Sequence, residues 1–558
     1  MSDDDLLDVA VVGAGPSGLM IANLLGQRGL RVGVFDAASE LIDFPRGVGM
    51  DDETLRAFQN AGLVNAVLQH TVPHQLLVFV DAKSRVLARM APPTAQFGWP
   101  RRNGFVQPLA DRVLLEGLSR FDKVQVHWSS SAVGLRQDAD GVDLEVDGPS
   151  GRRVFRARYV VGADGGSSTT RKALGIAFAG TTAPAHWLVI DIRNDPLGRP
   201  GAYVWADPNR PYVSISIPHG IRRFEFMLKP GETESDATSD EFVARLLEPI
   251  MPAPNKVDVI RRRVYTHHSR MAESFRSGRV FLIGDAAHVM PVWQGQGYNS
   301  GIRDALNLSW KLAMAVDGVA SDRILDSYET ERRDHVRAMI AWSTLVGRSV
   351  CITNRAVAGI RNTLLRGVSA LPRVKSYIVE MRFKPMPAMR EGALSHVGSQ
   401  SEPSPVGQLF VQPSVSTRGG GSMRFDDAVG SWFALVVWNN NPREVLDDDA
   451  LARLARLGAT LVAARPAVQL EWDPGAPDDS VLVVGDVDGT LKRWFDEHTE
   501  SVVLIRPDRI VAGACPAYAA SDMVRGFDRA IGAGDPDPDA DRGGPAGPRQ
   551  PATSEAVR

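Results

Sequence analysis

Three glycines near the start of the chain have the spacing that dinucleotide binding requires. They form the pattern Gly13-x-Gly15-x-x-Gly18, which follows the apolar segment 6–12 and opens the helical pattern 16–28. In such a turn the first glycine permits a tight bend, the second lets the backbone approach a pyrophosphate, and the third lets the helix pack close to the strand. The free N–H groups and the positive dipole end of the helix would then face the phosphates. The pattern predicts a dinucleotide-binding site.

The segments around this turn complete a strand–helix–strand unit. The apolar segment 31–35 predicts a second strand, and Asp36 closes it. A carboxylate about 20 residues after the last glycine commonly binds the ribose of the dinucleotide. Ser17 lies inside the glycine turn itself. We therefore expect Ser17 and Asp36 to contact the cofactor, although the turn alone does not distinguish FAD from NAD.

Two further buried-strand patterns end in an acid beside a glycine. The segment 158–162 leads into Asp164, and the segment 279–284 ends in Gly284, which is followed by Asp285. Either segment alone is typical of an ordinary strand-ending turn. Together with the glycine turn, and in this order, they resemble the three signatures of the class A flavoprotein monooxygenases, the para-hydroxybenzoate hydroxylase-like group. The resemblance implies that FAD is the cofactor, that Asp285 binds its ribityl hydroxyls, and that Asp164 serves FAD and NAD(P)H binding.

A glycine-rich segment follows the third motif and opens a long helical pattern. Its glycines would let backbone N–H groups approach a flat ring, and the helix N-terminus would stabilise negative charge on a reduced flavin. The residues of this segment that we expect at the cofactor are Pro291, Gly295, Gly297 and Asn299. Two more residues resemble cofactor-contacting positions of the family, namely Arg46 and Gln107.

Segments spread over the chain are similar to one subgroup in the phenol hydroxylase branch of this family. The subgroup hydroxylates 3-(3-hydroxyphenyl)propionate and 3-hydroxycinnamate in aromatic catabolism. The similar segments include 43–46, 97–103, 210–214, 222–227, 264–267, 290–301, 331–335 and 381–387. The resemblance implies that NADH reduces FAD and that O2 then forms a flavin C4a-hydroperoxide. The carbon ortho to the phenol oxygen attacks this hydroperoxide, and the product is a 2,3-dihydroxy catechol.

The implied reaction leaves the protein to ionise a phenol and to bind a carboxylate. His or Tyr side chains at hydrogen-bond range are suited to moving the phenol proton near neutral pH. The catalytic candidates that could face the ring are Tyr203, His219, His267 and Trp293. The candidates for binding the substrate, including two arginines for its carboxylate, are Tyr212, Arg210 and Arg222.

The order of strand and helix patterns predicts an α/β fold with several parts. The expected architecture is a Rossmann-like FAD-binding domain with an inserted β-sheet substrate domain and a C-terminal thioredoxin-like domain. The expected bounds are 1–185 for the first part of the FAD-binding domain, 186–275 for the β-rich substrate region, 276–395 for the rest of the FAD-binding domain with its long helices, 396–533 for the thioredoxin-like domain, and 534–558 for a Pro- and Gly-rich tail. The composition of the tail predicts disorder.

Composition and charge exclude several function classes. The 558 residues carry a net charge of -3 with acids and bases mixed, so no basic stripe for nucleic acid is expected. No apolar stretch approaches the roughly 20 residues of a membrane span, and the acidic first residues do not resemble a secretory signal. We therefore expect a cytoplasmic location. Cys351 and Cys515 form no CxxC pair, which leaves both a metal site and thioredoxin chemistry unsupported.

Without a CxxC pair, the C-terminal domain is expected to have a structural or dimerisation role, so the chain is a possible homodimer. The main partner expected is a small phenolic acid.

Two alternatives stay open from the sequence. One is a flavin hydroxylase of another substrate, such as a chlorophenol or a polyketide. The other is a non-catalytic flavin-binding protein, which the retention of all the FAD motifs disfavours.

Overall fold

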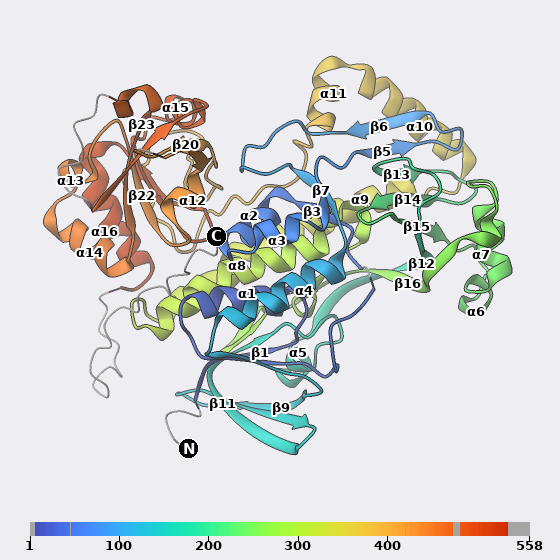
Figure 1. Ribbon diagram of the computed structural model, residues 1–558, viewed down its shortest axis with the longest axis horizontal. Coiled ribbons are helices and arrows are strands. Elements are labelled where there is room, and N and C mark those ends of the chain that lie inside the picture. The colour runs from blue at the N-terminus through green and yellow to red at the C-terminus, as the bar shows by residue number, and fades with distance from the viewer. Residues whose placement is uncertain (1–5, 45, 419, 472–479, 534–558) are drawn as a thin grey trace.

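The computed structural model describes residues 6–44, 46–418, 420–471 and 480–533. Its helices and sheets gather into three regions (Figure 1). The region that begins with the first strand lies at the bottom centre, a β-rich region lies at the right, and the C-terminal region, coloured orange to red, lies at the left. The tail 534–558, for which disorder is expected, lies outside the described residues.

The glycine turn lies at the carboxyl edge of a mostly parallel sheet. Strand β1 (Leu7–Val12) pairs in parallel with β2 (Val32–Phe35) and with β11 (Gly151–Gly162), and β11 pairs in parallel with β18 (Val280–Leu282). The other strands of this sheet are β8 (Val124–His127), β9 (Ser131–Gln137), β10 (Val142–Gly148) and β17 (Arg276–Ser277). Because β1, β11 and β18 run in one direction, the three motifs that follow them meet at one edge of the sheet.

Helices cover this sheet and bring the later glycine-rich segment to the same edge. Helix α1 (Pro16–Gln27) packs against α8 (Gln296–Val316), and α1 also contacts α4 (Gln107–Gly117). The close approach of α1 to α8 depends on small residues, since a side chain at Gly301 would overlap the hydroxyl of Ser17. The N-terminus of α8 therefore lies beside the N-terminus of α1. Helix α2 (Asp52–Asn60) and the 28-residue helix α9 (Arg323–Val350) also pack against α8.

The β-rich region is an eight-stranded sheet in the order β19-β16-β12-β15-β14-β13-β5-β6. Its central strands are β12 (Phe178–Arg193), β13 (Ala202–Trp205), β14 (Tyr212–Ile217), β15 (Ile221–Met227) and β16 (Asp258–Ala272). Its outer strands are β5 (Leu77–Val80), β6 (Val86–Met90) and β19 (His288–Val289). The sheet thus extends beyond the expected segment 186–275, because strands from both flanking parts of the chain pair with it.

A small sheet and a pair of helices lie beside the two larger sheets. A three-stranded sheet joins β3 (Gly49–Asp51), β7 (Arg102–Phe105) and β4 (Thr71–Val72). Helices α10 (Arg355–Ala370) and α11 (Pro372–Val379) follow α9 and pack over β6.

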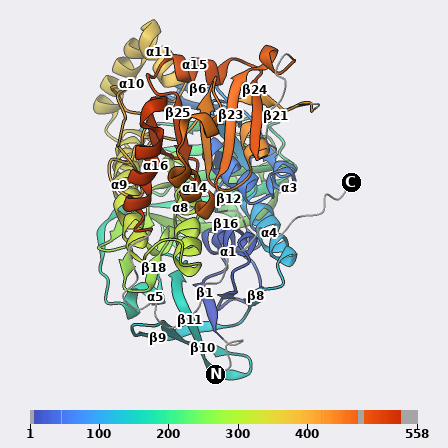
Figure 2. The same cartoon turned by 90° about the vertical axis from the view of Figure 1, so that its left-hand side faces the viewer.

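The C-terminal region has the strand arrangement of a thioredoxin-like domain (Figure 2). Its core strands are β22 (Ala434–Trp438), β23 (Thr460–Pro466), β25 (Val502–Ile505) and β26 (Val511–Cys515), in the spatial order β23-β22-β25-β26. The first two run parallel around helix α14 (Asp448–Leu457), and the last two form an antiparallel pair before helix α16 (Ala520–Ala530). Cys515 is buried and free. The α/β fold class, with this third domain, is confirmed.

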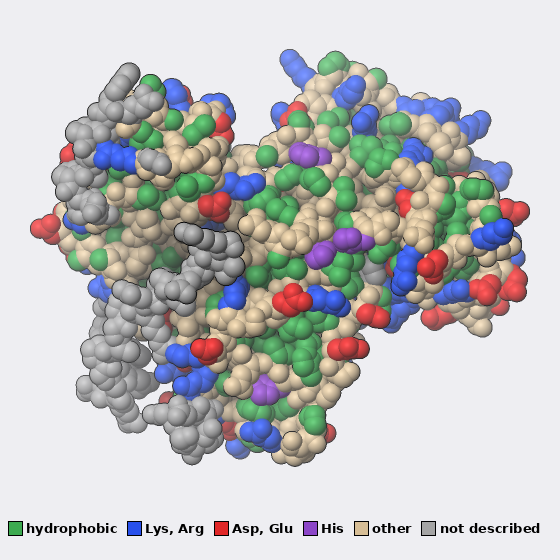
Figure 3. Space-filling model, viewed as in Figure 1, with side chains coloured by type: hydrophobic (Ala, Val, Ile, Leu, Met, Phe, Trp, Pro, Cys, Tyr) green, Lys and Arg blue, Asp and Glu red, His purple; other side chains and the backbone are tan. Residues whose placement is uncertain are grey.

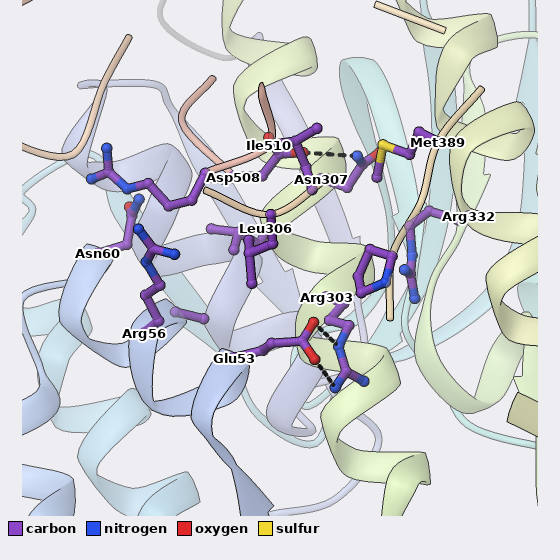
Figure 4. Close-up of a pocket in the computed structure, with 14 residues that line it drawn as sticks. Glu53, Arg56, Asn60, Arg303, Leu306, Asn307, Arg332, Met389, Asp508 and Ile510 are labelled. Atoms are coloured by element: carbon purple, nitrogen blue, oxygen red, sulfur yellow. Dashed lines mark hydrogen bonds and ion pairs between the residues drawn. The ribbon is translucent and has the colours of Figure 1, made fainter. Parts of the chain in front are cut away.

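Buried ions join the C-terminal domain to α8 and α9, and Figure 4 shows one contact of this group, between Asn307 and Asp508. Arg506 donates to both carboxylate oxygens of Glu331 at 2.8 and 2.7 Å and to Asp508 at 2.9 and 2.5 Å. Lys311 also donates to Glu331 at 2.8 Å, and Asn307 donates to Glu331 and Asp508. We call these five residues the interface network. Each of its charged groups is paired, which explains why so many ions are buried together.

The surface and the helices add two observations. On the face shown in Figure 3, acidic and basic side chains are interspersed over much of the area. Among the described residues, every helix is too short or too polar to span a bilayer.

Candidate active site

A cavity of about 310 Å³ lies where the three strand-end motifs, the start of α8 and the β-rich sheet meet. From the FAD-motif side its lining includes Gly15, Ser17, Arg46, Gly47, Gly49, Gln107, Gly165, Asp285, Gly295 and Gly297. From the β-rich sheet it includes Leu77, Ala202, Val204, Val213, Ile215 and Glu225, and Arg102 of β7 and Trp293 before α8 also line it. Segments more than 200 residues apart in the sequence thus share one cavity, with glycines on one side and mostly apolar side chains on the other.

The backbone of the glycine turn explains why each glycine is present. Gly13 has φ of 106°, and a side chain there would overlap the backbone of Ala163. A side chain at Gly18 would overlap the carbonyl oxygen of Gly13, so only glycine lets α1 start this close to β1. Gly15 instead faces open space, with no atom within 4 Å of where its Cβ would be. This leaves the N-terminus of α1 accessible to a phosphate group.

Asp36 and Asp164 both shape the loops around this turn. Asp36 accepts hydrogen bonds from the backbone N–H of Ala14 at 2.6 Å and of Ala38 at 2.8 Å. Asp164 accepts from the Ser168 hydroxyl at 2.5 Å and from the Thr170 backbone N–H at 2.9 Å. The Asp164 carboxylate therefore holds the start of a short helix, α5 (Thr169–Ala173), and its neighbour Gly165 lines the cavity instead.

Asp285, unlike Asp36 and Asp164, is not held by hydrogen bonds from described residues. Within the described part of the chain its carboxylate accepts no hydrogen bond, although it lines the cavity. The carboxyl is open to the cavity but closely surrounded by protein, and this burial raises its pKa. The electrostatic effects of His288 and Arg46 on the carboxyl oppose that rise only in part. Asp285 is thus an unsatisfied acceptor at the position where the resemblance puts the ribityl hydroxyls.

The side chain of Gln107 on α4 contacts the loop that contains Arg46 and precedes β3. The side-chain oxygen of Gln107 accepts from the Gly47 N–H at 2.6 Å, and its amide nitrogen donates to Asp111 at 3.0 Å. Arg223 of the β-rich sheet donates to the carbonyl oxygen of Arg46 at 2.7 Å. These bonds fix the backbone of the loop, while the Arg46 side chain stays exposed at the cavity.

The segment that opens α8 is held by Asn299. Its amide nitrogen donates to Gly295 O at 2.6 Å and to Gly49 O at 3.1 Å, and its oxygen accepts from Thr54 Oγ1 at 2.7 Å. The Asn299 side chain therefore ties α8 to α2 and to β3. Gly295 has φ of 63°, and a Cβ at Gly297 would meet no atom within 4 Å, so the backbone here is open to the cavity. Pro291 lies outside the cavity lining, and its carbonyl oxygen accepts from Ser343 at 2.6 Å.

The sheet side of the cavity contains one carboxyl group, Glu225 on β15. Tyr265 donates to its Oε2 at 2.8 Å, and His267 Nε2 lies 3.1 Å from the Tyr265 hydroxyl oxygen. Burial raises the pKa of Glu225, with Arg223 at 3.8 Å opposing it, and burial also raises the pKa of Tyr265 well above its usual range. Burial lowers the pKa of His267 to about 4. Tyr265 is thus a proton donor to Glu225, and His267 is neutral at physiological pH.

The structure brings only one catalytic candidate of the sequence to the cavity wall, namely Trp293. His267 lies one layer behind it, with the two ring centroids 5.4 Å apart. Tyr203 lies between Ala202 and Val204, which line the cavity, so its own side chain points to the opposite face of the sheet, as alternation along a strand requires. His219 lies in an exposed turn, with its Nε2 3.2 Å from Nδ1 of His70.

The three substrate-binding candidates have partners within the protein. Arg210 donates to Glu232 at 2.8 and 2.5 Å, and Arg222 donates to Asp195 at 2.6 and 2.7 Å. Tyr212 stacks on Trp205 with ring centroids 4.5 Å apart. None of the three lies among the cavity-lining residues. The two arginines pair with internal carboxylates, which sequence spacing did not reveal.

Sequence reasoning missed Glu225, Tyr265 and Arg102. One signal was available, because Glu225 is an acid in an otherwise apolar strand pattern, 224–227, where a buried acid is uncommon. The contact between Glu225 and Tyr265 has no such signal, since 40 residues separate them.

Comparison with known proteins agrees with this arrangement. Residues 6–343 match the FAD binding domain family, and residues 407–530 match the HcaD C-terminal domain family. The chain belongs to the FAD-dependent aromatic hydroxylases. A 3-(3-hydroxy-phenyl)propionate/3-hydroxycinnamic acid hydroxylase of Mycolicibacterium smegmatis is 57% identical to it over 94% of this chain and 93% of the relative. A hydroxylase of the same name from Paraburkholderia xenovorans is 47% identical over 93% of this chain and 90% of the relative.

Solved structures share the fold. The flavin-dependent monooxygenase PieE, solved in complex with FAD and substrate, has a TM-score of 0.78 at 22% identity, covering 95% of this chain and 99% of PieE. The p-nitrophenol 4-monooxygenase PnpA from Pseudomonas putida has a TM-score of 0.63 at 26% identity and covers 68% of this chain and 98% of its own. The family, the FAD cofactor and an aromatic hydroxylase activity predicted from the motifs are confirmed.

Proposed function

We propose that this hydroxylase acts on 3-(3-hydroxyphenyl)propionate and 3-hydroxycinnamate and consumes NADH and O2. The phenol, NADH, a proton and O2 become the 2,3-dihydroxy product, NAD⁺ and water. The 3-(3-hydroxy-phenyl)propionate/3-hydroxycinnamic acid hydroxylases that are 57% and 47% identical to this chain support the substrate class. The observation that carries the proposal is the cavity, because it joins an open glycine-lined edge to an apolar sheet face with one carboxyl group.

FAD fits the glycine-lined side on two observations. The space in front of Gly15 would be filled by any Cβ, and Asp285 is an acceptor without a donor. We assign the phosphates to the N-terminus of α1 with Ser17, the ribose to Asp36, and the ribityl hydroxyls to Asp285. Arg46 and the open backbone at Gly295 and Gly297 would contact the rest of the cofactor. Gln107, Asp164, Pro291 and Asn299 would act by holding these loops in place.

When bound, FAD supplies the activation of O2, which the family resemblance attributes to its C4a position. The protein must then take the phenol proton, because a phenolate is far more nucleophilic at its ortho carbon. Glu225 is the group suited to this step, since its Oε2 accepts from Tyr265, whereas its Oε1 lies 3.8 Å from Arg223 Nη1, beyond hydrogen-bond distance, and can accept the phenol O–H. A raised pKa makes its carboxylate a better base than an ordinary glutamate. The apolar residues around it exclude water and keep the ring flat against the sheet.

An NADH oxidation assay with a panel of phenols tests the proposal. The purified protein with FAD should oxidise NADH several-fold faster with 3-(3-hydroxyphenyl)propionate than without substrate, and it should release one catechol per NADH. Phenol and chlorophenols are the comparison substrates, with the catechols identified by mass. If a chlorophenol or a polyketide phenol outperforms the phenolic acid, the named substrate is wrong. If no phenol stimulates NADH oxidation, the flavin-binding alternative is favoured.

A further inference from the structure

Arg102 is a cation at the cavity wall without a partner of its own. It is the first residue of β7, and its backbone pairs with Asp51 of β3. Its side chain lines the cavity, and both terminal nitrogens lie 4.0 Å from where a Cβ on Gly49 would be. The Nε atom is fully enclosed by protein and has no hydrogen-bond partner. Throughout the described residues, nothing accepts a hydrogen bond from this guanidinium or forms an ion pair with it.

The neighbouring acid is already neutralised by other cations. Asp51 accepts from Lys384 at 2.8 Å and is also paired with Arg303. Burial lowers the pKa of Arg102 to about 10, with no acid compensating the loss of hydration. A half-buried guanidinium whose Nε is enclosed and that has no anion is costly, so such a group is normally paired or serves a ligand.

Two other buried arginines of the cavity region show what the fold does otherwise. Arg222 and Arg223, both on β15, each bind an aspartate through two nitrogens, Asp195 and Asp191 respectively. Arg102 has the same chemistry and is directed at the cavity instead. An anion that enters the cavity would find the geometry that carboxylates prefer, a planar fork of N–H donors.

The separation between Arg102 and Glu225 restricts which kind of molecule can carry the anion. The backbone of Arg102 accepts from Gln75, which lies two residues before the start of β5, whereas Glu225 lies on β15. Three strand spacings of about 4.8 Å, or roughly 14 Å, separate β5 from β15 across β13 and β14. The side chains between them at the cavity are Leu77, Ala202, Val204, Val213 and Ile215. A molecule that meets both groups is therefore polar at two ends and apolar between them.

We infer that Arg102 binds the carboxylate of the substrate's acidic side chain, while the phenol hydroxyl meets Glu225 at the other end of the apolar floor. This assignment rests on the proposed function and replaces Arg210 and Arg222 in that role. It makes Arg102 the residue that selects phenolic acids over neutral phenols. An aromatic ring with a three-carbon acid in the meta position has the required two polar ends.

The test compares an acid with its neutral counterpart in FAD-loaded enzyme. Arg102→Met keeps the bulk of the side chain and removes the charge. The KM for 3-(3-hydroxyphenyl)propionate should rise by about 10- to 100-fold, the range for losing charge-assisted hydrogen bonds. The KM for 3-ethylphenol, which lacks the carboxylate, should change by less than about threefold because it never used them. Arg102→Lys should recover part of the loss, since it restores charge without the planar fork.

Arg199→Met is the matched control. Arg199 stacks on Tyr203, on the face of the sheet away from the cavity, with its guanidinium carbon 3.6 Å from the ring centroid. The same substitution there should leave the KM for both substrates unchanged. An equal rise for the acid in both variants would show a general effect of removing positive charge and would overturn the assignment.

Binding of 3-phenylpropionate, a non-reactive acid, gives a readout without turnover. It is followed by the change in flavin absorption, and Arg102→Met should weaken it by the same factor as the KM. If the variant instead loses FAD, or loses acid and neutral substrates equally, Arg102 serves the cofactor and the inference is wrong. If the wild type binds 3-phenylpropionate through Arg102 but hydroxylates no phenol, the anion site stands and the proposed function fails.

Discussion

The cavity and the interface network treat buried charge in opposite ways. At the interface, Glu331 accepts hydrogen bonds from Arg506, Lys311, Asn307 and the Ala393 backbone. The charges of Arg506 and Lys311 hold the pKa of Glu331 well below its usual range. In the cavity, burial raises the pKa of Glu225 and Asp285 and lowers that of Arg102. Burial disfavours the charged form in both regions, and the number of partners differs.

This difference separates structural from functional charges without reference to their residue type. A group whose charged form is fully bonded inside the protein has no capacity left for a ligand, and its removal should affect folding. A group that is enclosed but unsatisfied is costly in the free protein and is justified only by something that binds or reacts there. The comparison therefore predicts stability effects at the interface and effects on activity or ligand affinity at the cavity.

Glu331→Gln should have the largest effect, and the effect should be on stability. Removing the charge leaves Arg506 and Lys311 buried without their main anion, and breaking such a buried pair costs about 3–5 kcal/mol. Urea unfolding of the FAD-loaded protein measures this change. Asp334→Asn, at an exposed ion pair with Arg337, is the control and should change the free energy of unfolding by less than about 1 kcal/mol.

The pH dependence of this difference follows from the lowered pKa of Glu331. Its stabilising contribution is fully present above the unfolded-state pKa of about 4.3 and declines as the pH falls below that value, toward the folded pKa. Wild type and Glu331→Gln should therefore converge in stability in acid. Equal stability of the two proteins at pH 7 would show that the network is not structural.

Glu225→Gln should lower kcat by about 100-fold or more, the usual effect of losing a general base. The KM should change little, because the amide has the same shape and still accepts from Tyr265. Stability should not fall, since a buried carboxyl with a raised pKa is replaced by a neutral group. Glu232→Gln, at the partly buried pair with Arg210, is the control and should keep kcat. A kcat within about threefold of wild type would remove Glu225 from the proposed mechanism.

The pH profile of kcat distinguishes a base from a merely structural carboxyl. Only the ionised carboxylate accepts the phenol proton, so kcat of the wild type should rise with pH through the pKa of Glu225. Because burial raises that pKa, the rise should lie above the ordinary glutamate value of about 4.3. In Glu225→Gln this acid limb should be absent. An unchanged limb in the variant would assign the titration to another group.

Asp285→Asn should weaken FAD binding by about 10- to 100-fold, as expected for losing hydrogen bonds to a charged acceptor. The dissociation constant for FAD, from the fluorescence of titrated flavin, measures this. Asp164→Asn is the informative counterpart, because its carboxylate is satisfied by Ser168 and Thr170. It should reduce stability by about 1 kcal/mol, as for the loss of a helix cap, and change FAD affinity less than Asp285→Asn does. The reverse order would contradict the comparison.

The sequence predicted well where local chemistry decides the structure. The glycine turn, the strand expected at 31–35 and the order of the motifs follow from patterns within a few residues, and the structure has a strand at Val32–Phe35. It predicted the fold class because three motifs on parallel strands must meet at one edge. The strands β5 and β6 were missed because their place in the β-rich sheet depends on pairing with β13, more than 100 residues away.

The substrate side of the site was predicted poorly for a physical reason. Residue type shows that an arginine could bind a carboxylate, but only the three-dimensional structure shows whether a carboxylate of the protein already occupies it. Asp195 forms an ion pair with Arg222, and Glu232 forms one with Arg210. Among the described residues no carboxylate pairs with Arg102, and no local pattern distinguishes it from its neighbour Arg101.

Tyr203→Phe should have the smallest effect on activity. Together with Val204, it compares the two faces of one strand, β13. Ala202 and Val204 line the cavity, whereas Tyr203 contacts Val78, Val80 and Arg199 on the other face. Loss of the hydroxyl should leave kcat and KM within about twofold, because the ring and its contacts on that face are kept and the site is not touched. Val204→Tyr, one residue along, should instead block the substrate, because alternation turns that side chain into the cavity. If Tyr203→Phe abolished hydroxylation, the sheet would have to bind its substrate on the opposite face.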